Sequence, residues 1–204
     1  MALASLVTDL KASLHDSAKV FTSPGDADFE RFLQQALPDM QFKRPLSRLA
    51  TVTLLTDQTR YAMPVSDFAA YKVSEWADPR RAPKPWEPGY PGPVPRISTE
   101  WDGAAWWVVM DPAPTAALLA CYGSSLRFWY FARHVLGAAD GDTTVNVLDR
   151  GLLLLRAQVE ALKEMAIRNV TKPVQMRDGL SGTPRNSTPS ALAEQLLTEF
   201  REAR

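Results

Sequence analysis

The stretch LATVTLLTDQTRYAM, residues 49–63, is where the chain changes from one secondary structure to another. Its first half alternates β-branched and apolar residues, a run that is typical of a β-strand. Asp57-Gln58-Thr59 predicts a turn and Arg60 to Met63 a second strand, so we expect a β-hairpin. The residues before Pro45 follow a helical spacing instead. This stretch therefore separates an N-terminal helical region from a β region.

Two helices are predicted before the β region. From Leu3 to Phe21, apolar residues recur every three or four positions, as in an amphipathic helix. Ser23 as an N-cap and Pro24 as the first helical residue predict a second helix. Proline disrupts a helix interior, so we expect this second helix to end near Leu37, before Pro38.

The β region continues to about residue 136. Asp67 to Ala70 predicts a short helical turn, and Tyr71 to Trp76 predicts a strand. Residues 78–95 are rich in proline, which fixes φ and removes backbone donors, so they predict an extended loop. The other predicted elements here are strands over 96–101, 105–110 and 125–135, a tight turn at Asp102-Gly103, and a brief helix within 112–122.

The strongest helical pattern comes next, from Val145 to about Asn169. Residues 171–188 are polar, contain glycine and proline, and predict a linker or arm. Ser187 or Thr188 is expected to cap a last helix. The apolar face of that helix has no obvious partner nearby in the sequence; it consists of Leu192, Leu196, Leu197 and Phe200.

These patterns predict an α+β protein, in which a helical bundle carries an inserted antiparallel β-sheet domain and a C-terminal arm ending in a helix. The predicted parts are N-terminal helices of the bundle over 1–45, the β region with its Pro/Trp-rich loop over 46–136, a long core helix over 137–170, and the arm with its helix over 171–204.

Composition narrows the possible functions. Lys plus Arg and Asp plus Glu each number 23 in 204 residues, so the overall charge gives no reason to expect sequence-independent binding of nucleic acid. The lone Cys121 cannot form an intramolecular disulfide, which suits a reducing compartment. The N-terminal residues match neither a signal peptide nor a membrane anchor.

Residues that could carry chemistry are few. The sequence has no phosphate-binding loop, no HExxH and no paired-cysteine motif. His15, His134 and Cys121 favour structural roles, with His15 on the surface and Cys121 buried as a small apolar side chain. We therefore expect no catalytic residues, no metal and no cofactor. A weaker alternative is a metal-dependent enzyme that binds Ca²⁺ or Mg²⁺ through Asp140, Asp142 and Asp149, although a solvated turn fits these residues better.

Five of the six tryptophans lie in or beside the proline-rich loop. One alternative function is a binding module that stacks single-stranded nucleic acid or glycan on Trp86 and Tyr90, with basic residues beside them. The favoured interpretation is that the strand tryptophans form sheet core and that the loop contacts a tail protein or a neighbouring subunit. The predicted contact residues of the loop are Arg80, Arg81, Trp86 and Tyr90.

Three short phrases, in order, resemble the adaptor, or head completion, proteins of tailed bacteriophages. The first is a D-Q-x-x-Y-x-x-P hairpin at residues 57–64, followed by Asp67-Phe68. The second is a strand ending in D-P-x-P at 111–114, and the third is L-x-F-x-Y-x-A at 126–132, before the long helix. The resemblance spans about residues 25–204, and the loop 78–95 departs from it.

The resemblance implies a structural virion protein without enzymatic activity, at the head-to-tail junction, assembled in the host cytoplasm. Its expected partners are the portal protein, about twelve copies of itself in a ring, and tail or neck proteins, with no membrane. Genomic DNA would pass through the lumen without sequence-specific binding. The residues implied for the portal-docking arm are Lys172, Arg177, Arg185, Leu192, Leu196, Leu197 and Phe200.

Overall fold

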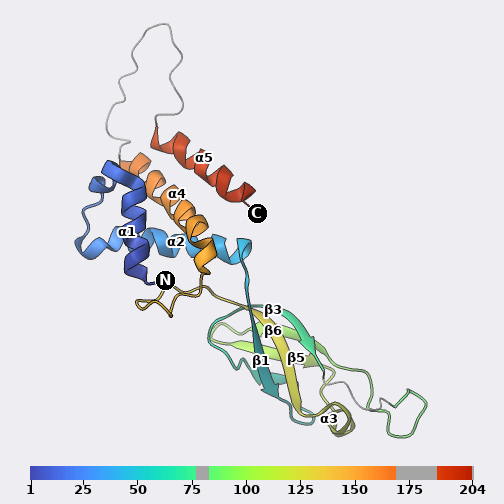
Figure 1. Cartoon of the computed structure of the whole chain (residues 1–204). Coiled ribbons are helices and arrows are strands. Elements are labelled where there is room, and N and C mark those ends of the chain that lie inside the picture. Colours follow the sequence, from blue (N-terminus) through green and yellow to red (C-terminus); the bar gives the residue numbers. More distant parts are fainter. Residues whose placement is uncertain (77–82, 169–187, 204) are drawn as a thin grey trace. The chain divides into compact units, whose positions relative to one another are not determined.

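The computed structural model of the chain describes residues 1–76, 83–168 and 188–203. They form two compact units (Figure 1). Unit 1 combines Met1–Arg44 with His134–Arg204 and is helical, whereas unit 2 is Pro45–Arg133 and contains all the strands of the described chain. The predicted α+β class is confirmed. No helix in the described ranges is long and apolar enough to cross a bilayer.

Unit 1 is a helical bundle with a core of its own. Its helices are α1 (Leu3–Leu14), α2 (Ala27–Lys43), α4 (Arg150–Arg168) and α5 (Pro189–Glu202), with short 3₁₀ turns at His15–Val20, Pro24–Asp26 and Val147–Asp149. The apolar faces of these helices meet in one core, so the helices are stabilised mainly by mutual packing. Its largest fully buried side chains are those of Leu6, Leu10, Phe32, Leu33, Met40 and Leu153.

Two helix ends differ from the predictions. α1 stops at Leu14, because His15 has a φ of 51° and leaves the helical region. The prediction that Pro38 ends the second helix is wrong, since α2 continues through it to Lys43. Met40, one turn beyond Leu37, is fully buried in the core, and this burial offsets the backbone hydrogen bond that proline cannot make.

Unit 2 consists of two antiparallel sheets of three strands each. One sheet has the order β1-β6-β3, from β1 (Leu46–Thr53), β6 (Ser125–Ala132) and β3 (Phe68–Glu75). The other has the order β2-β5-β4, from β2 (Arg60–Ala62), β5 (Trp106–Asp111) and β4 (Arg96–Trp101), and the short helix α3 spans Ala116–Tyr122. Both sheets contribute to one core, which includes Phe68, Leu126, Phe128, Tyr61, Val108 and Met110.

The hairpin predicted over residues 49–63 is wrong. β1 pairs with β6 and β2 pairs with β5, so the chain passes from one sheet to the other between them. The buried Tyr61 supports this passage, because its hydroxyl accepts a hydrogen bond from the Leu55 backbone N–H (3.1 Å) and lies 2.9 Å from the Gln58 carbonyl oxygen. Local sequence favours a turn here, but only long-range pairing decides which strands it joins.

A second local prediction in unit 2 is also wrong. The segment from Asp67 to Ala70 is not a helical turn, since β3 begins at Phe68. Phe68 is almost completely buried in the core, and the Asp67 carboxylate accepts hydrogen bonds from Tyr130 (2.8 Å) and Arg48 (2.5 Å). These contacts with neighbouring strands hold the segment extended.

The hairpin predicted at Asp102-Gly103 is confirmed, with β4 and β5 paired from Arg96 to Asp111. Gly103 has a φ of 97°, which glycine adopts without strain. Asp102 Oδ1 accepts hydrogen bonds from the backbone N–H groups of Ala104 (2.9 Å) and Ala105 (2.8 Å). The carboxylate therefore forms an Asx turn with these N–H groups and stabilises the hairpin.

The prediction that tryptophans form the sheet core is only partly right, because Trp76 and Trp106 pack against the core of unit 2 whereas Trp101, Trp107 and Trp129 do not belong to it. Trp101 is exposed and the other strand tryptophans are only half-buried, whereas the buried aromatic residues of unit 2 are Tyr61, Phe68, Phe128 and Tyr130. Tryptophan is large and carries an N–H that needs a partner, so it fits the margin of a small core better than its centre.

Candidate functional site

The two histidines and the cysteine occupy structural positions. His15 is exposed, and Cys121 is half-buried rather than buried as predicted. His134 Nε2 lies 2.7 Å from the Arg44 carbonyl oxygen and Nδ1 lies 3.2 Å from Thr144 Oγ1. Both nitrogens of the His134 ring therefore hold the chain in place.

Two of the three aspartates considered for a metal site, Asp140 and Asp149, have separate partners, and the Asp142 backbone N–H donates to the Ala139 carbonyl (3.2 Å). Asp149 pairs with Arg44 Nε (2.9 Å), and Asp140 pairs with the Met1 ammonium group (3.5 Å). Among the described residues, no group of three or more His, Cys, Asp or Glu is placed to hold a metal ion. Asn146 caps the turn before α4 by accepting a hydrogen bond from the Leu148 N–H (2.9 Å). The metal-dependent alternative thus gains no support.

The C-terminal helix α5 is the first candidate interaction surface. Thr188 caps it as predicted, since its hydroxyl oxygen accepts a hydrogen bond from the Ala191 N–H (3.2 Å). α5 lies against α4 of the same chain (Figure 1), so the expectation that its apolar face lacks a partner is wrong. Of its predicted docking residues, Phe200 is buried, Leu196 and Leu197 are partly buried, and Leu192 is 40% exposed. Lys172, Arg177 and Arg185 lie outside the described residues.

Two grooves show that α5 covers its neighbours incompletely. A groove of about 390 Å³ lies between the C-terminal part of α4 and the N-terminal part of α5, and includes Ala166, Ile167 and Ala193 in its lining. A second, of about 280 Å³, lies between α2 and the C-terminal part of α5, and includes Phe42, Leu197 and Phe200. Phe42 is 86% exposed at the mouth of the second groove.

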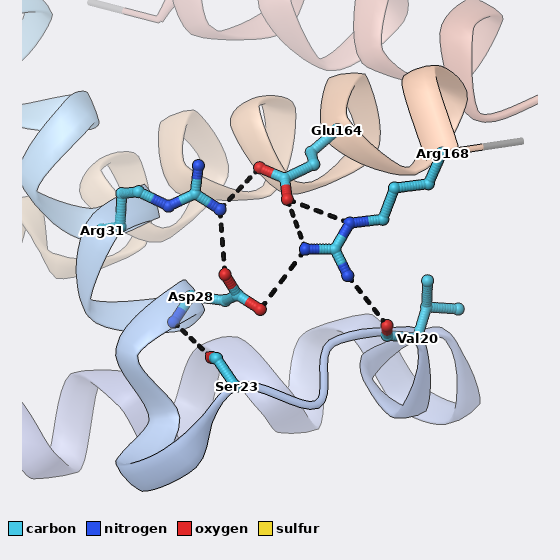
Figure 2. Close-up of polar contacts among 6 residues, drawn as sticks. All are labelled: Val20, Ser23, Asp28, Arg31, Glu164 and Arg168. Carbon is cyan, nitrogen blue, oxygen red and sulfur yellow. Dashed lines mark hydrogen bonds and ion pairs between the residues drawn. The ribbon is translucent and has the colours of Figure 1, made fainter. Parts of the chain in front are cut away.

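A network of charged residues anchors the end of α4 (Figure 2). Arg31 Nη2 donates hydrogen bonds to Glu164 (2.6 Å) and Asp28 (2.9 Å). Arg168 donates to Glu164 through Nε (3.0 Å) and Nη2 (2.5 Å), and to the Val20 carbonyl through Nη1 (3.1 Å). Arg168, the last described residue before the segment 169–187, is therefore fixed to the turn His15–Val20 and, through Asp28 (3.5 Å), to α2.

Burial and hydrogen bonding shift the pKa of Asp28 in this network in opposite directions. Burial alone would raise the pKa of Asp28, but hydrogen bonds with Ser23 and Arg31 and the charge of Arg168 outweigh it and lower that pKa. The hydrogen bond to Glu164 is the largest of the effects that raise the pKa of Arg31. Sequence reasoning missed this network, although the spacings Asp28–Arg31 and Glu164–Arg168 are those of helical ion pairs.

The described part of the proline-rich loop, residues 83–95, is the second candidate surface. Trp86 is 76% exposed, and the Lys84 ammonium lies 5.4 Å from the centre of its ring. Tyr90 is more covered, and its backbone N–H donates to the Glu87 carbonyl (3.2 Å). Arg80 and Arg81 lie outside the described residues. The loop thus presents one large exposed ring with a cation beside it.

Comparison with known proteins gave only distant similarities. No family model and no curated protein matches the chain. Solved structures with some similarity include the neck of an empty gene transfer agent (GTA) particle, with 15% identity, coverage of 96% of this chain and 88% of that chain, and a TM-score of 0.32. Another is from a native GTA virion, with 14% identity, the same coverage and a TM-score of 0.31. TM-scores this low transfer neither fold nor function to this chain.

Proposed function

We propose that this protein is an adaptor of a tailed bacteriophage. It would dock onto the portal as a ring of about twelve copies around the DNA channel and provide the platform to which the tail attaches. The phrases that resemble the adaptor family, 57–64, 111–114 and 126–132, lie along β2, β5 and β6 and their adjoining segments in unit 2. The helical bundle of unit 1 provides the body of such a ring subunit.

The observation that carries the proposal is the way α5 is held. This amphipathic helix ends the described chain, and only two of its side chains, Ala193 and Phe200, are buried. Open grooves remain along it on both sides, and Leu192 faces solvent. A helix whose apolar face is only partly buried on its own bundle can exchange that contact for a groove on a partner. We infer that α5, together with the preceding residues 171–187, is the portal-docking arm.

The experiment mixes the purified protein with the portal of the same virus and measures complex mass by mass photometry. We expect a ring of about twelve copies on the portal, and loss of that complex when residues 188–204 are deleted. A point variant isolates the contact: Leu192→Asp should weaken portal binding while leaving the bundle folded. Gln195→Glu, an exposed position on the same helix, is the matched control and should bind as the unchanged protein does.

Two outcomes would reject the docking arm. One is portal binding that survives the deletion at full strength, and the other is equal binding by the Leu192→Asp and Gln195→Glu variants. Absence of any complex between the unchanged protein and the portal would reject the adaptor function itself.

The exposed Trp86 favours one second candidate, a module that stacks single-stranded nucleic acid or glycan. An indole with an ammonium beside it offers both a stacking face and a charge for a phosphate. Fluorescence titration with a single-stranded oligonucleotide and with an oligosaccharide at modest salt tests it. Trp86→Ala should abolish the binding and Trp101→Ala, an exposed tryptophan outside the loop, should preserve it. No binding by the unchanged protein, or equal binding by the two variants, would reject this candidate.

A further inference from the structure

The apolar side chains of α5 are engaged by its own bundle. Ala193 and Phe200 are buried in the core of unit 1, and Leu196 and Leu197 pack against that core. The spacing of these four residues, three or four positions apart, places them on one face of the helix. α5 lies along α4 with this face covered (Figure 1). The stripe that would bind a groove on another protein is therefore already in use.

The face of α5 that remains in solvent is polar. Gln195, Thr198 and Glu199 are exposed. Gln195 Nε2 donates to Glu199 Oε1 (3.1 Å), and the Thr198 hydroxyl donates to the Glu194 carbonyl (2.9 Å), so these groups bond within the helix. A hydrophobic groove recognises the apolar stripe of a helix rather than its polar face. While α5 lies on the bundle, it offers such a groove little beyond the partly exposed Leu192.

A contact from α2 holds the C-terminal end of α5. The Lys43 ammonium donates a hydrogen bond to the Arg201 carbonyl oxygen (2.6 Å). The last carbonyl groups of a helix have no partner within the helix and carry partial negative charge. Lys43 therefore supplies both a donor and a compensating charge. This contact exists only while α5 lies on the bundle, so it stabilises that position over the released helix.

We propose that the bundle-bound position of α5 competes with the portal, and that Lys43 helps to set the balance between the two. This inference rests on the proposed portal-docking arm. The side chains that would fill a groove on the portal, such as Leu197 and Phe200, are the ones that contact the bundle. α5 cannot occupy both positions at once, so the portal binds only molecules whose α5 has left the bundle.

This competition links two measurable quantities. The apparent affinity for the portal equals the intrinsic affinity multiplied by the fraction of molecules whose α5 is released. While most molecules hold α5 on the bundle, any change that weakens the bundle-bound position strengthens portal binding by the same factor. The same change speeds hydrogen exchange along α5, which is measured without the portal.

A cleavable cross-link tests whether α5 must leave the bundle. Ile167 of α4 and Ser190 of α5 both line the first groove, and both are exposed. In the full chain with Cys121→Ser, the substitutions Ile167→Cys and Ser190→Cys provide two thiols that a disulfide-containing bismaleimide joins. We expect the linked protein to lose binding to the portal of the same virus in mass photometry. A reductant that cuts the linker should restore the binding.

The matched control places the same linker within α5. Gln195→Cys and Glu199→Cys lie one turn apart on its polar face, so linking them leaves the helix free to move. This protein should bind the portal equally before and after linking. Full binding by the protein linked between Ile167→Cys and Ser190→Cys, or equal loss in both linked proteins, would overturn the inference and leave the adaptor function standing. No binding by the unchanged protein would instead reject the adaptor function, and this inference with it.

Lys43→Met tests the contact at the C-terminal end of α5. We expect exchange along α5 to become about fivefold faster and portal binding to tighten by a similar factor. Lys163→Met is the matched control, because that lysine lines the first groove but pairs with Glu160 of its own helix (3.0 Å); it should change neither quantity. Unchanged exchange in Lys43→Met would overturn the role of Lys43, and faster exchange without tighter portal binding would overturn the competition.

Discussion

At the residue scale, Asp102 is the clearest pH-sensitive group in the turn between β4 and β5. Backbone hydrogen bonds from Ala105 and Ala104, together with the indole of Trp107, lower the pKa of Asp102 to about 2. Its pKa in the folded protein is thus below that of an unfolded aspartate, about 3.9. The carboxylate therefore stabilises the fold above about pH 4, and this contribution is lost as pH falls toward 2.

We predict that Asp102→Ala lowers the unfolding temperature at neutral pH, and that the difference from the unchanged protein shrinks between about pH 4 and pH 2. Thermal unfolding across this range measures it, and an NMR titration should place the midpoint of the Asp102 carboxyl near 2. A midpoint near 4, or a difference that does not change with pH, would contradict the prediction.

Arg156 is the buried charge of the bundle, with only 8% of its surface exposed. Its guanidinium pairs with Asp39 (2.5 Å) and Glu160 (2.5 Å), which remain partly in solvent. We predict that Arg156→Ala lowers the free energy of unfolding by about 2 kcal/mol, less than a fully buried pair because water still reaches both carboxylates. Arg156→Met, which keeps the apolar packing of the side chain, should cost less.

Urea denaturation measures the cost of losing Arg156. Arg127→Ala is the matched control, because it breaks an exposed ion pair and should change the free energy of unfolding by no more than about 0.5 kcal/mol. Equal effects of Arg156→Ala and Arg127→Ala would show that the buried pair does not stabilise the bundle.

At the scale of single elements, α5 depends on its N-cap. Thr188→Ala removes the side-chain acceptor for the Ala191 N–H, which should cost about 1 kcal/mol and speed hydrogen exchange along α5 while α4 exchanges as before. Thr198→Ala is the control, since that hydroxyl only donates back to the Glu194 carbonyl within the helix. Faster exchange in α4 and α5 alike would mean that the two helices open as one unit.

Sequence periodicity predicted elements well where a single face is buried. The 3.6-residue pattern located α4 and α5, and the turn chemistry of Asp102-Gly103 located the hairpin of β4 and β5. Sequence periodicity failed where contacts between residues far apart in the sequence determine the structure. Pro38 lies inside a helix because residues on both sides of it reach the core, and β1 leaves its neighbour in sequence because β6 pairs with it.

The candidate surfaces were partly predictable. The apolar stripe of α5 and the exposure of Trp86 follow from the sequence. The packing of α5 on α4 could not be predicted from the sequence, because the polar segment 169–187 separates the two helices along the chain. The alignment of Leu49, Trp129 and Val73 across three strands was equally unpredictable, since it depends on the registers of β1, β6 and β3.

At the scale of the whole molecule, unit 2 is an insertion into unit 1. The chain enters it between Arg44 and Pro45 and leaves it between Arg133 and His134. The first and last paired residues, Leu46 and Ala132, lie opposite each other in the β1–β6 ladder, so the two connections start close together.

We therefore predict that unit 1 folds without unit 2. Replacing residues 46–132 by a short glycine-serine linker should give a chain that keeps its helical circular dichroism and unfolds cooperatively. The physical reason is that unit 1 has a separate apolar core, made only of its own residues. A chain with helical signal but no cooperative unfolding would contradict the prediction.

The double connection also has a mechanical consequence. Any tension between the two units passes through two backbone strands in parallel, and each strand bears only part of the load. The strands are coupled on both sides of the boundary, by the His134 contact with the Arg44 carbonyl in unit 1 and by the Leu46–Ala132 pairing in unit 2. A break in one of the two connections would therefore leave the units joined through the other.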